Sequence, residues 1–105
     1  MRDADRRVAV TGAGVVSSLG TDLDTFWRHC LEGRSVVEEI PAAWSRHSAT
    51  LRSRVWSPLG EWERETPLMT RIERKQLDPS GRIALLAAEE ALRRAGLPLE
   101  IADPK

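Results

Sequence analysis

A glycine-rich loop near the N-terminus offers the first candidate chemistry. Residues 8–20, VAVTGAGVVSSLG, pass from β-branched residues into a loop that contains Gly12 and Gly14. A GxGxxG loop binds a cofactor's pyrophosphate when a helix begins inside the motif, because the amides of the helix N-terminus then face the phosphates. Here Ser17 takes the third glycine position, and the first helix-start signal comes only at Thr21. The pattern therefore favours glycines that allow a positive φ or a close backbone contact over dinucleotide binding.

Two further features disagree with a dinucleotide site. The acidic residue that would bind a ribose about 20 positions on is Glu32, which falls at the end of an expected helix rather than of a strand. The other glycine pattern, TG followed by a later GxG, would need glycines where Val16 and Ser18 stand. We expect no cofactor-binding residue in this loop.

Cys30 beside His29 suggests a nucleophilic thiol with its base. Consecutive helical residues diverge by about 100°, which places Cys30 among apolar residues and His29 on the solvent-exposed face. A reactive thiolate needs an electropositive, partly exposed setting, so a structural role for Cys30 is favoured. Together with His47, these residues are too few and too scattered for a zinc site. We expect no catalytic and no metal-binding residue among them.

Four tryptophans suggest a stacking platform for single-stranded nucleic acid or a cage for an aromatic ligand. They are Trp27, Trp44, Trp56 and Trp62. Arginines are interleaved with them, at Arg46, Arg52, Arg54 and Arg64, but the same stretch contains Glu61, Glu63 and Glu65, which would repel phosphate. Over the chain, 16 Lys and Arg balance 16 Asp and Glu, whereas nucleic-acid binding needs a clustered excess of cations. We therefore expect the tryptophans to pack in a core or an interface, and no nucleic-acid partner.

The elements that would position these residues begin with a strand and a helix. Arg7–Thr11 (RVAVT) is apolar between its ends, which is typical of a strand covered on both faces. Thr21 with Asp24 resembles a capping box and Gly33 supplies a stop, which predicts a helix over residues 22–32. One apolar stripe of this helix is predicted to be buried. It consists of Leu23, Phe26, Trp27, Cys30 and Leu31.

The second half of the chain contains one long helix signal. Residues 34–77 have no clear periodicity and are expected to be irregular but packed, with a short strand at 53–56 (SRVW). Asp78 then caps a helix over residues 79–95, which has Pro79 at its first position and is stopped by Gly96 and Pro98. Two ion pairs at i,i+4 spacing are expected within it. They join Glu89 to Arg93 and Glu90 to Arg94.

This second helix has apolar residues on two sides. Small and apolar residues line one side, namely Ala84, Leu85, Ala88, Ala91, Leu92 and Ala95, whereas Ile83 and Leu86 project elsewhere. A surface helix of a lone small domain needs only one apolar face, so two faces imply neighbours on two sides. A chain of 105 residues makes one small domain or a piece of a larger one, and we expect more protein than this chain supplies.

Two blocks of the sequence are similar to one family. Residues 6–35, RRVAVTGAGVVSSLGTDLDTFWRHCLEGRS, closely resemble the N-terminus of β-ketoacyl-[acyl-carrier-protein] synthases, where RRVVVTG precedes GxGxVSxLG and a DxxxFWxxLLxGxS helix. Residues 84–97, ALLAAEEALRRAGL, resemble the family's ALAAAEEAL…AGL helix, and residues 53–62, SRVWSPLGEW, resemble its GxVxDF strand and turn more weakly. The chain departs from RRMDRF at residues 74–82, RKQLDPSGR, and some polyketide- or polyene-type members carry a Gly-Arg pair at the site of Gly81 and Arg82.

The resemblance implies an α/β fold, the N-terminal piece of a thiolase-like αβαβα fold, with residues 1–105 as a partial ketosynthase domain. It also implies the family's reaction, a decarboxylative Claisen condensation in fatty acid or polyketide synthesis. Its partners are acyl carrier protein and acyl or malonyl thioesters, and the complete enzyme is a homodimer or heterodimer. The catalytic Cys stands in a TACSS-like motif that this sequence lacks, and His29 and His47 do not occupy the family's histidine motifs. The resemblance thus implies an inactive scaffold portion with no catalytic residue.

Two other functions stay open. One is a non-catalytic ketosynthase-like subunit or degenerate paralogue that binds a full-length synthase, and the more distant one is a nucleotide-binding module. No apolar run approaches the ~20 residues that a membrane span needs and no signal peptide is recognised, so a cytoplasmic location is expected. Weak stability in isolation is also expected, because a pairing of residues 7–11 with 53–56 alone makes only a two-stranded sheet.

Overall fold

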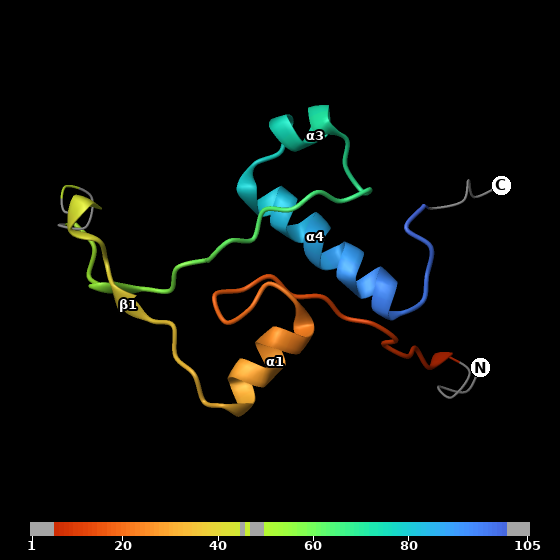
Figure 1. Cartoon of the computed structure of the whole chain (residues 1–105), viewed down its shortest axis with the longest axis horizontal. Helices are drawn as coiled ribbons and strands as arrows, with labels where there is room; N and C mark the ends of the chain where they lie inside the picture. The colour runs from red at the N-terminus through yellow and green to blue at the C-terminus, as the bar shows by residue number, and fades with distance from the viewer. Residues whose placement is uncertain (1–5, 45, 47–49, 101–105) are drawn as a thin grey trace. The chain divides into compact units, whose positions relative to one another are not determined.

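The computed structural model describes residues 6–44, 46 and 50–100 (Figure 1). Its elements are α1 (Leu23–Leu31), β1 (Glu38–Glu39), the 3-10 helix η2 (Ala42–Trp44), β2 (Val55–Trp56), α3 (Arg71–Gln76) and α4 (Pro79–Arg94). The chain divides into two compact units, residues 1–15 with 64–105 and residues 16–63. The mixture of helices and strands agrees with the α/β class. Within the described ranges, no helix is long and apolar enough to cross a membrane.

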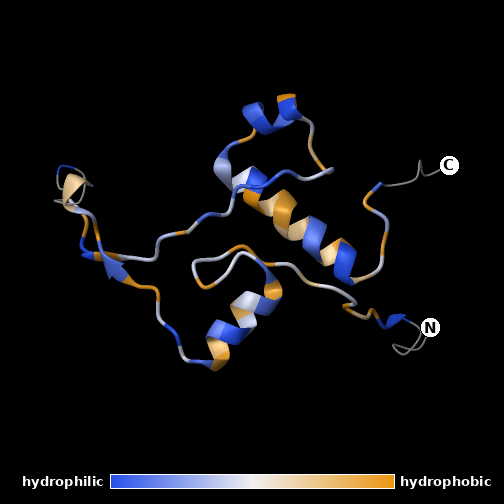
Figure 2. Ribbon diagram, in the orientation of Figure 1, coloured by the Kyte–Doolittle hydropathy of each residue, from blue (hydrophilic) through white to orange (hydrophobic). Residues whose placement is uncertain are grey.

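The helix α4 begins and ends where its capping residues predict. The Asp78 carboxylate accepts a hydrogen bond from the Gly81 N–H at 2.8 Å, and Pro79 takes the first helical position, where its missing N–H costs nothing. Gly96 follows the helix with a φ of +72°, a conformation that favours glycine. Figure 2 shows hydrophobic residues on the middle turns of α4 and hydrophilic residues toward its end. The helix predicted over residues 79–95 is confirmed.

Leu86 is the buried residue of α4. Leu86 is 1% exposed, whereas Ala84 and Ala88 are exposed and Leu85 and Leu92 are half-buried. The sequence predicted neighbours on two sides of α4, and Leu86, which projects away from the small-residue side, is the residue that the structure buries. The small-residue side nevertheless has a covered part, where the N-terminal segment crosses the helix.

The strand predicted for Arg7–Thr11 is wrong for this chain. These residues form no strand, and the side chains of Val8 and Val10 are 92% and 88% exposed. A strand needs hydrogen-bonding neighbours, and a segment meant to be covered on both faces needs packing partners as well. The described part of the chain supplies neither to this segment.

Helix α1 and its N-cap each come one residue later than predicted. Asp22, rather than Thr21, is the N-cap, and its carboxylate accepts hydrogen bonds from both the backbone N–H and the hydroxyl of Thr25 at 2.9 Å. Gly33, with a φ of +66°, ends the helix as predicted.

The predicted burial of the apolar stripe on α1 is only partly correct. Leu23, Phe26 and Cys30 are half-buried, but Trp27 and Leu31 are 59% and 71% exposed. The unit of residues 16–63 is too small to cover the whole stripe.

The two strands form one antiparallel pair, with Glu38 opposite Trp56 and Glu39 opposite Val55. The short strand predicted at 53–56 is thus confirmed over its last two residues, but it pairs with β1 and not with residues 7–11. The helix α3 was not predicted from the sequence. Its N-terminus has a capping box, in which Thr70 and Glu73 exchange hydrogen bonds of 3.1 and 3.2 Å between side chain and backbone.

Candidate functional site

Gly12 and Gly14 lie where the N-terminal segment runs against α4. A Cβ atom at Gly12 would stand 2.7 Å from the backbone nitrogen of Ala95, and one at Gly14 would stand 3.0 Å from that of Ala91. The carbonyl oxygens of Ala91 and Ala87 would be closer still. Neither glycine has a positive φ. Of the two roles that the sequence predicted for these glycines, close backbone contact is confirmed and a positive φ is wrong.

A carboxylate of α4 holds the next peptide group of this loop. The Val15 N–H donates to Oε1 of Glu90 at 3.0 Å, and the other oxygen of Glu90 accepts from Nε of Arg94 at 3.2 Å. Hydrogen bonds to an ionised group are among the stronger ones in proteins. A phosphate at this amide would be repelled by the carboxylate already bound there. The loop is therefore arranged to pack on α4.

Ser17, in the third glycine position, belongs to a tight turn with Gly20. Their backbone groups exchange hydrogen bonds of 2.9 and 3.2 Å. The Ser17 hydroxyl donates to the Gly20 carbonyl at 3.1 Å and accepts from the Leu19 N–H at 3.2 Å. The polar groups of Ser17 are thus engaged within the turn.

The structure does not bring His29 and Cys30 into a thiol–base pair. Nδ1 of His29 contacts the carbonyl oxygen of Leu19, and the imidazole is half-buried rather than on a solvent-exposed face, so that prediction is wrong. Cys30 is half-buried, and His47 lies outside the described residues. Among the residues that the structure describes, no group of three or more His, Cys, Asp or Glu is placed to hold a metal ion.

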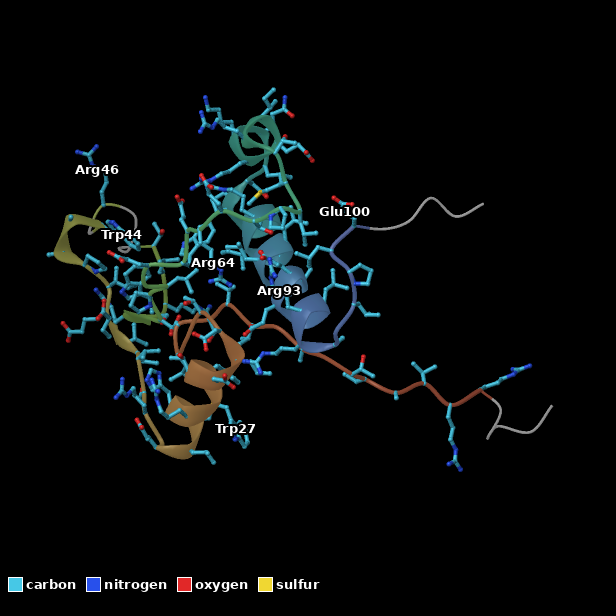
Figure 3. All side chains as sticks on the ribbon, turned by 45° about the vertical axis from the view of Figure 1, so that its right-hand side comes forward. Trp27, Trp44, Arg46, Arg64, Arg93 and Glu100 are labelled. Atoms are coloured by element: carbon cyan, nitrogen blue, oxygen red, sulfur yellow. The ribbon has the colours of Figure 1, made fainter. Side chains whose placement is uncertain are left out.

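Two of the four tryptophans pack on each other. The rings of Trp44 and Trp56 meet edge to face, with centroids 4.5 Å apart and planes at 63°. Such contacts stabilise beyond the area they bury. Trp27 instead projects outward from α1 (Figure 3). The predicted packing role is confirmed for the pair, and Trp27 is exposed.

A second carboxylate of α4 is at the centre of a charged network. Glu89 accepts from Nε of Arg93 at 3.0 Å, and its side chain is 13% exposed. Burial alone would raise the pKa of Glu89, but hydrogen bonds from Thr66 and Arg93 and the positive charges of Arg93 and Arg64 lower it below its ordinary value. Thr66 itself is buried, and Arg64 and Arg93 are both drawn in Figure 3. This network fastens the segment around Thr66 to α4.

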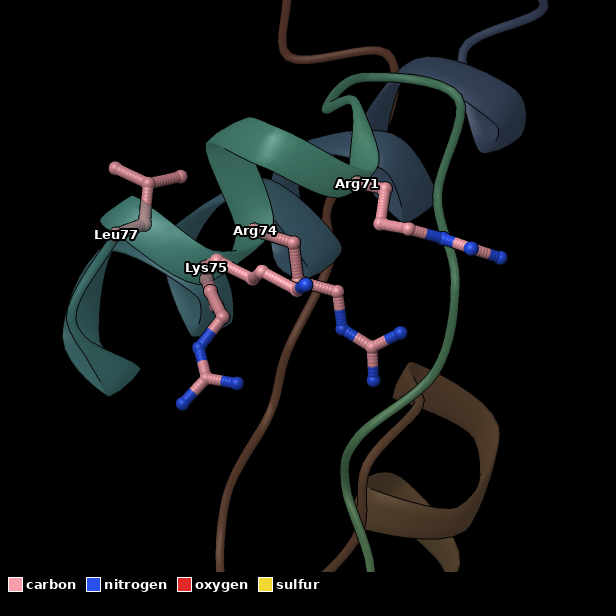
Figure 4. A pocket seen from close by; sticks show the side chains of 5 residues that line it. Arg71, Arg74, Lys75 and Leu77 are labelled. Carbon is pink, nitrogen blue, oxygen red and sulfur yellow. The ribbon is translucent and has the colours of Figure 1, made fainter.

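Four cations surround one pocket of about 470 Å³. We call it the basic pocket; it is lined by Arg71, Arg74 and Lys75 of α3, Leu77 after that helix, and Arg82 of α4. Figure 4 shows the three cationic side chains of α3 extending away from that helix. No carboxylate is among the lining residues, so the lining carries a positive charge. The sequence reading missed this site, although the spacing of positions 71, 74 and 75 is helical.

The other unit contains an apolar groove of about 390 Å³. Its apolar walls are Leu19, Phe26, Val36 and Val37, and Arg34 lies among its other lining residues. Nothing in its lining has the residue types of a catalytic nucleophile with a base.

Comparison with known proteins identifies the family of this chain. A family model described as "Beta-ketoacyl synthase, N-terminal domain" matches residues 5–105. The chain is 40% identical over 96 residues to Nodulation protein E of Rhizobium sp. (strain N33), which covers 89% of this chain and 22% of that protein. It is 37% identical over 92 residues to the putative polyketide beta-ketoacyl synthase 2 of Streptomyces cyaneus, covering 88% of this chain and 21% of that protein.

A more distant relative is the non-reducing polyketide synthase men2 of Menisporopsis theobromae, 32% identical over 108 residues that cover 90% of this chain and 5% of that protein. The chain spans about a fifth of the length of the first two relatives. No solved structure matches it. Since the family model covers nearly the whole chain, including the glycine loop packed on α4, the chain belongs to the β-ketoacyl synthase family and to its N-terminal domain.

Proposed function

We propose that this chain is the N-terminal scaffold portion of a β-ketoacyl-[acyl-carrier-protein] synthase, which joins an acyl thioester to malonyl-carrier protein by decarboxylative Claisen condensation. The observation that carries the proposal is the close packing of the glycine loop on α4. It occurs in a chain that the family model matches over residues 5–105. Gly12, Gly14 and Glu90 are used for packing there. We assign no catalytic, cofactor-binding or metal-binding role to any residue of this chain.

Polyketide synthesis is the pathway class that the relatives favour. One of the similar proteins is named a putative polyketide beta-ketoacyl synthase and another a non-reducing polyketide synthase. We extend that substrate class to the longer protein that carries this chain, and we place it in the cytoplasm.

The basic pocket is the surface on which we place the carrier protein. The chain as a whole has 16 cationic and 16 acidic residues, so a pocket with four cations and no carboxylate in its lining is a local concentration of charge. Complementary charge speeds association and excludes wrong partners. An acidic face of a carrier protein fits such a surface.

The assay that tests the proposed activity uses the full-length protein. Purified full-length protein is given an acyl thioester and malonyl-carrier protein, and 3-oxoacyl product is measured by mass spectrometry. We expect product from the full-length protein and none from residues 1–105 alone. Product from residues 1–105 would overturn the scaffold assignment. A full-length protein that forms no product but co-purifies with an active synthase would establish the non-catalytic subunit instead.

A charge reversal tests the carrier surface. The double variant Arg71→Glu/Lys75→Glu is expected to raise KM for malonyl-carrier protein at least about tenfold, because like charges placed at an interface repel. The matched control is Arg52→Glu/Arg54→Glu, which makes the same charge change at two exposed arginines of the other unit. Equal KM values for the two double variants would show that the carrier protein does not bind at the basic pocket. The proposed condensing activity would not be affected by that result.

A further inference from the structure

We propose that Arg82 is the specificity-determining residue of the basic pocket, and that it selects an acidic carrier protein through a directed contact with one carboxylate. This inference rests on the proposed function, since it assumes a carrier protein at the basic pocket. The other cations of the pocket then attract the carrier protein, whereas Arg82 recognises it.

Arg82 differs from the other lining cations in its place. Of the cations that line the pocket, it is the one that comes from α4, and its backbone N–H donates to the Asp78 carbonyl at 3.1 Å. The same Asp78 holds the Gly81 N–H through its side chain. The first turn of α4, which contains Arg82, is therefore held by two hydrogen bonds to Asp78, one to its carbonyl and one to its carboxylate.

The turn before Arg82 is closely packed. A Cβ atom at Gly81 would stand 3.1 Å from Oδ1 of Asp78 and 3.3 Å from Cδ2 of Leu77. Glycine at this position lets Leu77 and Asp78 approach the helix start. This packing fixes the position from which the Arg82 side chain enters the pocket.

Burial separates Arg82 from the exposed cations of α3. Arg71 and Lys75 are exposed, whereas Arg82 is half-buried and its Nε atom is buried. A side chain that is already restricted loses less rotamer entropy when it binds a partner. Arg74 is also half-buried, but it stands on the six-residue α3 and lines a second, neighbouring pocket as well.

The chemistry of the guanidinium supplies the selectivity. It presents donors in a planar fork that matches the two oxygens of a carboxylate, whereas an ammonium group acts as a point charge. Exposed cations act at longer range and are screened by salt, with a Debye length of about 8 Å at physiological ionic strength. The contribution of Arg71 and Lys75 should thus fall with salt, and that of Arg82 should persist.

The experiment compares Arg82→Lys and Arg82→Ala with Lys75→Ala in the full-length synthase, at low and at high salt. We expect both Arg82 variants to raise KM for malonyl-carrier protein about tenfold or more with little change in kcat, because a hydrogen bond between charged groups is lost. Lys75→Ala should raise KM a few-fold at low salt and have little effect at high salt. Melting temperatures verify that each variant is folded.

A second arm identifies the carboxylate. Carrier proteins with one acidic residue neutralised at a time are assayed against the wild-type synthase and against Arg82→Ala. One neutralisation should raise KM with the wild type and have no further effect with Arg82→Ala, which is the signature of a direct pair.

The outcomes distinguish a failure of the role proposed for Arg82 from a failure of the proposed carrier-protein surface. A wild-type KM for Arg82→Lys, or additive effects of Arg82→Ala with every carrier variant, would overturn the specificity role. If the Arg82 variants behave as wild type while Arg71→Glu/Lys75→Glu raises KM, the carrier surface stands and Arg82 is not its selector. If none of these variants raises KM, the carrier surface itself is wrong.

Discussion

Gly14 shows most directly how a single atom decides the packing of this chain. A Cβ atom there would collide with the backbone of α4, at Ala87 and Ala91. Overpacking of this kind typically costs about 1–3 kcal/mol. The same argument applies to Gly12, and it explains why two glycines stand in a loop where neither has a positive φ.

Gly14→Ala should therefore lower the Tm of the full-length protein by several degrees, measured by differential scanning calorimetry. The matched control is Gly60→Ala, since a Cβ atom at Gly60 meets nothing within 4 Å. Equal melting temperatures for the two variants would show that the loop does not pack on α4 as described.

Glu89 makes stability depend on pH in a defined direction. Its pKa is lowered from the ordinary value of 4.5, so the ionised carboxylate stabilises the fold at pH values above about 4.5. This contribution is lost as the pH falls through the lower pKa of the folded state. Glu89→Gln should lower the Tm of the full-length protein at pH 7, and the difference from wild type should shrink on acidification below about pH 4.5.

The control for this pH series is Glu61→Gln, which neutralises an exposed glutamate. Its Tm should follow that of the wild type at every pH. A Glu89→Gln variant whose deficit is the same at pH 7 and pH 3 would contradict the role given to the carboxylate charge.

At the scale of elements, the helices depend on local caps. Asp78, Thr70 and Asp22 each accept a hydrogen bond from the backbone N–H three residues further on, in α4, α3 and α1 respectively. These signals lie within a few residues of each other, so the sequence alone identified α1 and α4. It missed α3 because a six-residue helix has too few turns to show periodicity.

The cap of α4 can be measured in a peptide comprising residues 76–97. Asp78→Ala should reduce its helix content, seen by circular dichroism, by the equivalent of about 1 kcal/mol. Asp78→Asn should retain most of the helix, because asparagine caps nearly as well. Equal helix content in all three peptides would mean that the Asp78 side chain does not cap α4.

At the scale of the whole molecule, this chain has little interior. Of the described residues, Leu86 and Thr66 are the buried ones, while Val8, Val10, Trp27 and Leu31 are largely exposed. The strand pair β1–β2 is two residues long on each side. A fold with so few buried apolar groups offsets little of the conformational entropy lost on ordering.

The isolated chain of residues 1–105 should therefore melt without a sharp cooperative transition in calorimetry. The amides of residues 7–11 should exchange with solvent at nearly the rate of an unstructured peptide, because they have no strand partner there. In the full-length synthase the same amides should be protected. A sharp melt and slow exchange in the isolated chain would contradict this expectation.

The sequence by itself determined the family motifs and the helices α1 and α4, because caps, stops and motif spacing are local; for Gly12 and Gly14 it left a positive φ and a close backbone contact open, and the structure chose the contact. It misplaced His29 and predicted a strand at residues 7–11, because burial and strand pairing depend on distant partners.

Only the tertiary structure decided which residues distant in sequence meet. It brought Val15 to Glu90 across 75 positions, Thr66 to Glu89, and Arg82 of α4 beside the cations of α3. The physical reason is that a helix fixes its own hydrogen bonds through neighbours in sequence, whereas a charged pocket exists only when packing carries its side chains to one place.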